Sequence, residues 1–184
     1  MRLDDIDYKI IELLQQNARM TQLDIAAAVG MSQPAVAERM RRIEQEGVIT
    51  AYFARVDGRR LGKDITAFIG VGIEHPKYNT GFAKKILAIP DVLECHHVTG
   101  PYSYLLKVVT ESTGSLDRLI SEWLRRIPGV TRTHTTIVMS SVKESTYVKP
   151  TIEKKAIKKQ SSLTTYQNQS PKKRKQHGPT HKIK

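Results

Sequence analysis

The chain has 184 residues, of which 39% are hydrophobic and 26% charged, a balance typical of a soluble globular protein with one or two domains. No segment is long and apolar enough to span a membrane, and the first residues resemble neither a signal peptide nor a transit peptide, so we expect a cytoplasmic protein. The single cysteine, Cys95, excludes an internal disulfide and a cysteine-based zinc finger built from this chain alone.

The formal net charge of +12 is concentrated at the C-terminal end. Residues 149–184 hold 11 Lys and Arg against one acid, Glu153, whereas residues 1–60 hold nine basic and nine acidic side chains. A basic chain favours a polyanionic partner, but a charge-balanced N-terminal region must bind through a local face. Residues 149–184 also contain very few aliphatic side chains, so we predict a disordered basic tail.

Two helices are predicted in the first 30 residues. The first covers 4–17, with Asp4 or Asp5 as its cap and an apolar stripe made of Ile6, Ile10, Leu13 and Leu14. Thr21 caps a short second helix, and Gly30 suits the left-handed position at which a helix ends.

A third helix follows after a very short turn. Ser32 can cap it, Pro34 is tolerated in its first turn, and Gly47 ends it. Its buried stripe consists of Val36, Met40 and Ile43. Two short helices joined by a tight glycine-containing turn, with another helix before them, are typical of a helix-turn-helix unit.

The remaining pattern predicts an α+β arrangement. Residues 48–57 have strand character and precede a glycine-containing turn, which makes them a candidate wing. Strands and helices then alternate in the order βαββαβ of a ferredoxin-like fold, over residues 65–74, 80–88, 92–99, 104–110, 115–127 and 130–140. Because both helices cover one face of such a sheet, we expect Phe68, Val108 and Val138 to bury the other face against a second subunit.

Four segments together indicate a family: LDDIDYKIIELLQQNAR, AAAVGMSQPAVAERMRRIEQEGVI, VLECHHVTGPYSYLLKV and IPGVTRTHTTIVMSSVKE. With these segments in this order, residues 3–145 resemble the Lrp/AsnC (leucine-responsive/asparagine regulator) family of transcription regulators. One residue departs from the family's Gly-x-Tyr-Asp-Tyr turn, because Ser103 stands where an aspartate is usual. The basic tail is not part of the family pattern.

The resemblance and the patterning together predict four regions. Residues 1–50 form a winged helix-turn-helix DNA-binding domain, and 51–64 form a strand linker or wing. Residues 65–148 form a ferredoxin-like oligomerisation and effector-sensing domain, and 149–184 form the basic tail.

The third helix supplies the candidate contacts with double-stranded DNA. Its exposed face, opposite the buried stripe, and its N-terminal tip carry six of the candidates, and the resemblance adds Arg39; the full set is Ser32, Gln33, Pro34, Glu38, Arg39, Arg41 and Arg42. The alternative is that the three arginines belong to a solvated face balanced by nearby glutamates. The preceding helix-turn favours the DNA interpretation.

The resemblance implies a small-molecule pocket at the turn after the second strand of the sheet. It nominates Thr99, Gly100, Tyr102, Ser103 and Tyr104, with His134 and Thr136 from the final strand. Cys95 and His97 share one side of their strand, but without a metal-binding spacing a structural role is favoured and no metal site is predicted.

These features predict a sequence-specific transcription regulator. No nucleophile-base pair, phosphate-binding loop or paired carboxylates appear, so we expect no catalysis and no cofactor. The protein is expected to be nucleoid-associated and homo-oligomeric, a dimer at minimum that assembles into a tetramer or an octamer, and to respond to an amino acid or a related metabolite. The alternative is an architectural protein that compacts DNA with little sequence preference, aided by its basic tail.

Overall fold

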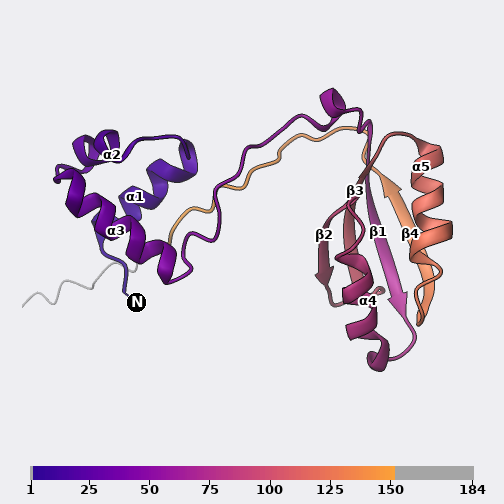
Figure 1. The fold of residues 1–184 in the computed structure, drawn as a ribbon. Coiled ribbons are helices and arrows are strands. Elements are labelled where there is room, and N and C mark those ends of the chain that lie inside the picture. Colours follow the sequence, from indigo (N-terminus) through magenta and orange to yellow (C-terminus); the bar gives the residue numbers. More distant parts are fainter. Residues whose placement is uncertain (1, 152–184) are drawn as a thin grey trace, which may run out of the picture. The chain divides into compact units, whose positions relative to one another are not determined.

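The computed structural model describes residues 2–151, so most of the predicted basic tail lies outside the described residues. Three N-terminal helices precede a βαββαβ unit (Figure 1). The elements are α1 (Asp5–Gln16), α2 (Gln22–Val29), α3 (Gln33–Gln45), η1 (Gly58–Leu61), β1 (Ile65–Ile73), η2 (Pro76–Tyr78), α4 (Asn79–Ile86), β2 (Val92–His97), β3 (Tyr104–Thr110), α5 (Thr113–Arg118), η3 (Leu119–Leu124) and β4 (Val130–Ile137). No helix in the described part is long and apolar enough to cross a membrane.

The first two helices begin at the predicted caps. Asp4 and Thr21 each close a capping box, the first with Asp7 and the second with Asp24. In such a box two backbone N–H groups that have no partner within the helix each receive a side-chain acceptor. The residues buried between the three helices are Ile10, Ile11, Leu14, Ile25, Ala26, Val36 and Ile43. The predicted apolar stripes of α1 and α3 therefore meet in one core.

The turn between α2 and α3 is as short as the sequence predicts. Gly30 adopts a left-handed conformation with φ of 70°, which ends α2 at low steric cost. The backbone N–H of Met31 then donates to the carbonyl of Ala26 at 3.0 Å. α3 follows within three residues, so the helix-turn-helix geometry is set by local hydrogen bonds.

The strand predicted over residues 48–57 is wrong for the single chain. Residues 50–57 have no assigned strand, and the turn after them is the short 3-10 helix η1. A β-strand needs a neighbouring strand to hydrogen-bond with, and the described sheet pairs only β1, β2, β3 and β4 with one another. β propensity alone therefore did not produce a wing strand here.

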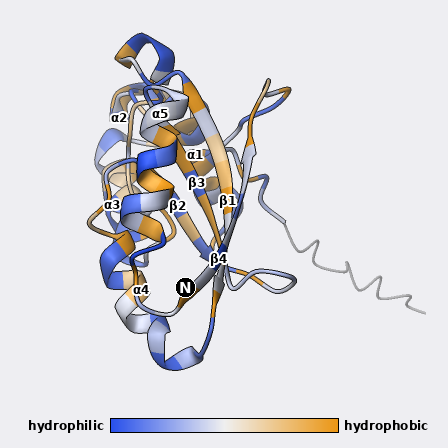
Figure 2. Ribbon diagram, turned by 90° about the vertical axis from the view of Figure 1, so that its right-hand side faces the viewer, coloured by the Kyte–Doolittle hydropathy of each residue, from blue (hydrophilic) through white to orange (hydrophobic). Residues whose placement is uncertain are grey.

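Residues 65–137 form the predicted ferredoxin-like unit. Its four strands are antiparallel in the order β2-β3-β1-β4. In Figure 2, α4 and α5 lie on the same side of the strands. The core lies between these helices and the sheet, and its largest fully buried members include Phe82, Ile69, Leu106 and Leu124. Within the described residues, one face of the sheet therefore lacks a helical cover.

The uncovered face contains only part of what the sequence predicted. Phe68 lies there with 39% of its surface exposed. The placement of Val108 on this face was wrong, because β3 alternates so that Tyr104, Leu106 and Val108 point into the core and Val108 is fully buried. Val138 follows the last residue of β4 and is half-buried, and its N–H donates to the carbonyl of Thr66.

Candidate nucleic-acid interface and ligand cavity

The predicted DNA contacts lie together along α3 and at its N-terminal tip. Six of the seven are exposed, namely Ser32, Gln33, Pro34, Glu38, Arg41 and Arg42, and Arg39 is half-buried. Val36 and Ile43 lie on the opposite side of the helix in the core of the domain. α3 therefore presents one continuous polar surface, as a helix that enters the major groove must do.

The N-terminus of α3 differs electrostatically from those of α1 and α2. Its first turn contains no acidic residue, and the Ser32 side chain makes no capping hydrogen bond. α1 and α2, in contrast, both have acids in their first turns and closed capping boxes. Ser32 therefore occupies the predicted N-cap position of α3, but its side chain does not make the capping hydrogen bond. Unneutralised N–H groups and a nearby hydroxyl suit a phosphate group.

Arg41 and Glu38 form an ion pair on the exposed side of α3. Two guanidinium nitrogens of Arg41 donate to the two carboxylate oxygens of Glu38, at 2.6 and 3.0 Å. The guanidinium lowers the pKa of Glu38, so this carboxylate stays ionised at neutral pH. Exposed pairs of this kind contribute little to stability, because water screens them. Both side chains can therefore change partner when DNA approaches.

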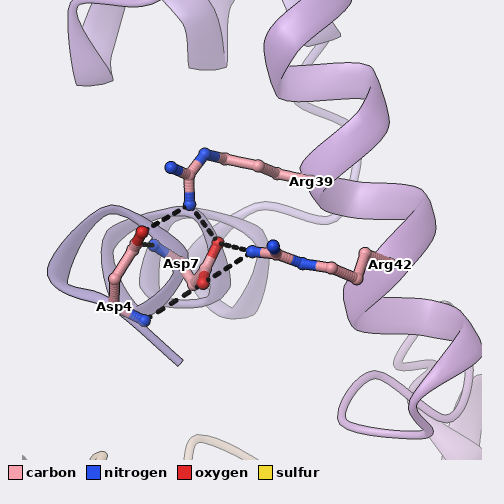
Figure 3. A network of polar contacts seen from close by, with 4 residues as sticks. All are labelled: Asp4, Asp7, Arg39 and Arg42. Atoms are coloured by element: carbon pink, nitrogen blue, oxygen red, sulfur yellow. Dashed lines mark hydrogen bonds and ion pairs between the residues drawn. The ribbon is translucent and has the colours of Figure 1, made fainter. Parts of the chain in front are cut away.

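Arg39 and Arg42 point instead toward the start of α1 (Figure 3). Nη1 of Arg39 donates to Asp4 at 2.8 Å and to Asp7 at 2.7 Å. Nη2 of Arg42 donates to both carboxylate oxygens of Asp7, at 2.9 and 3.0 Å. Asp7 is fully buried, and 21% of the Arg39 side chain and 45% of the Arg42 side chain are exposed.

This α1–α3 ion network joins the capping box of α1 to α3. The hydrogen bond from the Asp7 backbone N–H, with a smaller effect from Arg39, holds the pKa of Asp4 below its usual value. Asp4 raises the pKa of Arg39 in return, and Asp7 adds to this effect. A buried carboxylate is tolerated when ionised partners satisfy it. The Arg39 guanidinium therefore links α3 to α1 through its hydrogen bonds with Asp4 and Asp7. Arg42 also bonds to Asp7, but enough of its side chain is exposed for it to bind a phosphate as well.

The second predicted site is an open cavity of about 600 Å³ at the turn between β2 and β3. Four of the seven nominated residues line it: Thr99, Gly100, Tyr102 and Ser103. Ser103 fixes the turn to β1, because its N–H donates to the carbonyl of Val71 at 2.9 Å and its Oγ accepts from the N–H of Ile73 at 3.2 Å. The serine that replaces the family's aspartate thus has a structural contact.

Two glycines of β1 make room for this cavity. A Cβ at Gly70 would lie 2.5 Å from the Tyr102 ring, and a Cβ at Gly72 would lie 2.8 Å from Cγ of Arg132. The guanidinium of Arg132 lies 5.5 Å from the centroid of the Tyr102 ring. The two glycines therefore allow the Tyr102 ring and the Arg132 side chain to approach the backbone of β1 closely.

The other three nominated residues do not line the cavity. Tyr104 is buried with its ring 4.6 Å from that of Phe82, because strand alternation turns it into the core. His134 stacks against Tyr102 at 5.8 Å and so supports the cavity from β4. Thr136 lies opposite Phe68 in the β1–β4 register, two residues farther along β4.

Sequence reasoning missed two features of these sites. One is the pair of acids that bind the α3 arginines, and the other is the cation of the cavity. Asp4 was interpreted only as a helix cap, and neither Asp7 nor Arg132 was nominated. Asp7 is one turn before Ile10 on the buried stripe of α1, and an acid at such a position requires a buried partner.

In the described residues, no group of three or more His, Cys, Asp or Glu side chains could hold a metal ion. Burial raises the pKa of Cys95, so its thiol stays protonated at neutral pH.

Comparison with known proteins identifies this arrangement. A family model described as winged helix-turn-helix DNA-binding matches residues 3–50, and one described as Lrp/AsnC ligand binding domain matches residues 66–148. The HTH-type transcriptional regulator FL11 of Pyrococcus furiosus is 35% identical over 144 residues, which cover 78% of this chain and 94% of that protein. The chain belongs to the Lrp/AsnC family of transcription regulators.

Solved structures of the Lrp/AsnC family share the fold. E. coli AsnC superposes with a TM-score of 0.76 at 28% identity, covering 82% of this chain and all of that one. A transcriptional regulator of Neisseria meningitidis, solved as an L-Met complex, also has a TM-score of 0.76, at 26% identity over 80% of this chain and 96% of that one. The N-terminal helix-turn-helix domain and the α+β domain with its four-stranded antiparallel sheet are thus the family's architecture.

Proposed function

We propose that this Lrp/AsnC protein regulates transcription by sequence-specific DNA binding as a homo-oligomer, and that an amino acid or a related small metabolite modulates its activity. The observation that carries the proposal is the exposed polar face of α3, with an N-terminus that carries no acid in its first turn. Side chains on such a face can reach base edges while the helix end binds a phosphate.

The contacts divide by geometry into two roles. Gln33, Glu38 and Arg41 project from the exposed face and are the candidates for contact with base edges. Ser32 and Arg42 lie where phosphates would be met, and Arg39 positions the helix through Asp4 and Asp7. Phosphate contacts fix the register of the protein on the duplex, and base contacts determine which sequence it prefers.

A dimer would bind two half-sites through two copies of α3, so the symmetry of the site would follow that of the protein. The uncovered face of the sheet, with Phe68 exposed on it, is the candidate dimer interface and supports this part of the proposal. The cavity at the β2–β3 turn supports the proposal of a small-molecule effector. A relative crystallised with L-Met adds to that support.

We expect Arg41→Ala to weaken binding to the preferred DNA sequence without altering the melting temperature of the protein. Loss of a base contact costs about 1–3 kcal/mol at one position of the site, and loss of a phosphate contact reduces the salt slope by about one. Fluorescence anisotropy with labelled duplexes at several salt concentrations distinguishes these two cases. Arg118→Ala, which removes an exposed charge from α5, is the matched control. Equal affinities of the Arg41 and Arg118 variants would remove Arg41 from the interface.

A further inference from the structure

The cavity at the β2–β3 turn has an unusual balance of charge. Arg132 is a cation, and none of the described residues that line the cavity is Asp or Glu. Arg132 is exposed, lies opposite Gly72 in the β1–β4 register, and has its guanidinium beside the Tyr102 ring. The described lining therefore attracts anions and offers no carboxylate to a cationic group.

The guanidinium of Arg132 is held in place while most of its donors remain available. Nη2 of Arg132 donates to the carbonyl oxygen of Pro101. A guanidinium has five N–H donors in a planar fork that matches the two oxygens of a carboxylate. The contacts with Pro101 and Tyr102 therefore fix its orientation without using up its capacity to bind an anion.

Part of the backbone acceptor capacity around the cavity is already engaged. Three lining carbonyls accept hydrogen bonds from within the chain: that of Gly72 from Oγ1 of Thr131, that of Pro101 from Arg132, and that of Ser103 from the N–H of Val98. An ammonium group needs several acceptors to replace its water. Oγ of Ser103 accepts from the N–H of Ile73, and its hydroxyl hydrogen remains available to donate to a ligand.

From these contacts we propose that the cavity selects small monocarboxylates without an α-ammonium group, such as 2-oxo acids, and that Arg132 binds their carboxylate. The proposal rests on the effector-sensing part of the proposed function and names the ligand class of the same cavity. The 2-oxo oxygen would accept from the Ser103 hydroxyl. The matched amino acid would bring an ammonium group next to the Arg132 cation, where no carboxylate among the lining residues offsets it.

Matched pairs of compounds test this selectivity on the full-length protein. The pairs are pyruvate with L-alanine, 4-methyl-2-oxopentanoate with L-leucine, and phenylpyruvate with L-phenylalanine. Each pair has the same side chain, so only the α-substituent differs. We expect at least one 2-oxo acid to raise the melting temperature, and titration calorimetry to give it at least a tenfold lower Kd than its amino acid.

Variants of the cavity then test the role of each side chain. Arg132→Gln should weaken 2-oxo acid binding at least tenfold, with Arg132→Lys in between because it keeps the charge and loses the fork. Arg125→Gln is the matched control, since Arg125 donates to Thr133 of β4 but does not line the cavity. Ser103→Asp keeps an acceptor for the Ile73 N–H and adds an anion, so it should reverse the preference toward the amino acid.

The outcomes separate this proposal from the wider function. Equal or tighter binding of the amino acid to the native protein, or native-like 2-oxo acid binding by Arg132→Gln, would overturn the proposal while leaving effector sensing intact. If no compound of any pair binds at millimolar concentration, both the proposal and the effector-sensing claim fail. DNA affinity measured on the same preparations tests the regulator function separately, because it depends on α3.

Discussion

Replacing Asp7 with Asn is expected to destabilise the helix-turn-helix domain by about 2–4 kcal/mol and to weaken DNA binding severely. The amide keeps the shape of the buried side chain but removes the charge that Arg39 and Arg42 share. Breaking a buried ion pair costs roughly 3–5 kcal/mol, and the partial exposure of both arginines lowers that figure here. A domain of about 50 residues has little stability to lose.

The two halves of the protein can be followed separately in this experiment. The chain has a single tryptophan, Trp123, which lies in η3 of the ferredoxin-like domain. We expect urea unfolding of Asp7→Asn to show an earlier loss of helical circular dichroism with an unchanged tryptophan transition. Asp5→Asn, the same chemical change at an exposed position of the same helical turn, is the control. Coincident, native-like transitions in both variants would show that the α1–α3 ion network contributes little.

Phe68→Glu should convert the proposed dimer to a monomer at micromolar concentration. The substitution places a charge on the uncovered face of the sheet, where a partner subunit would have to desolvate it. Because two linked half-site contacts bind far more tightly than one, affinity for a two-half-site duplex should fall by about 10²–10⁴.

Sedimentation velocity and anisotropy on the same samples measure both effects. Leu87→Glu is the matched control, because Leu87 is an apolar side chain at the end of α4 with 88% of its surface exposed. A dimeric Phe68→Glu protein that binds DNA normally would exclude the uncovered sheet face as the dimer interface.

Much of the fold was predictable because its signals are local. Asp4, Thr21 and Gly30 mark helix ends through their own backbone geometry, so the helix-turn-helix unit could be recognised without tertiary information. The order of four strand-like and two helical segments similarly predicted the βαββαβ fold of the sheet. The strand expected at 48–57 failed because ladder hydrogen bonds depend on a partner strand, which β propensity does not reveal.

The sites were less predictable, since they depend on contacts between distant residues. Asp7 and Arg42 are 35 positions apart, and only the packing of α1 on α3 brings them together. Arg132 reaches the cavity because β4 pairs with β1 at Gly72, a register that the sequence does not specify. Helix periodicity placed Arg42 on the exposed face correctly, but it could not show that its guanidinium turns back toward α1.

The central claim, sequence-specific DNA binding, is tested most directly by the ratio of two affinities. A duplex enriched from a random-sequence pool by the full-length protein is compared with a shuffled duplex of the same length and composition, at physiological salt. A specific regulator predicts a ratio of about 10³ or more. A ratio within tenfold would contradict the account and favour an architectural protein that binds DNA through charge alone.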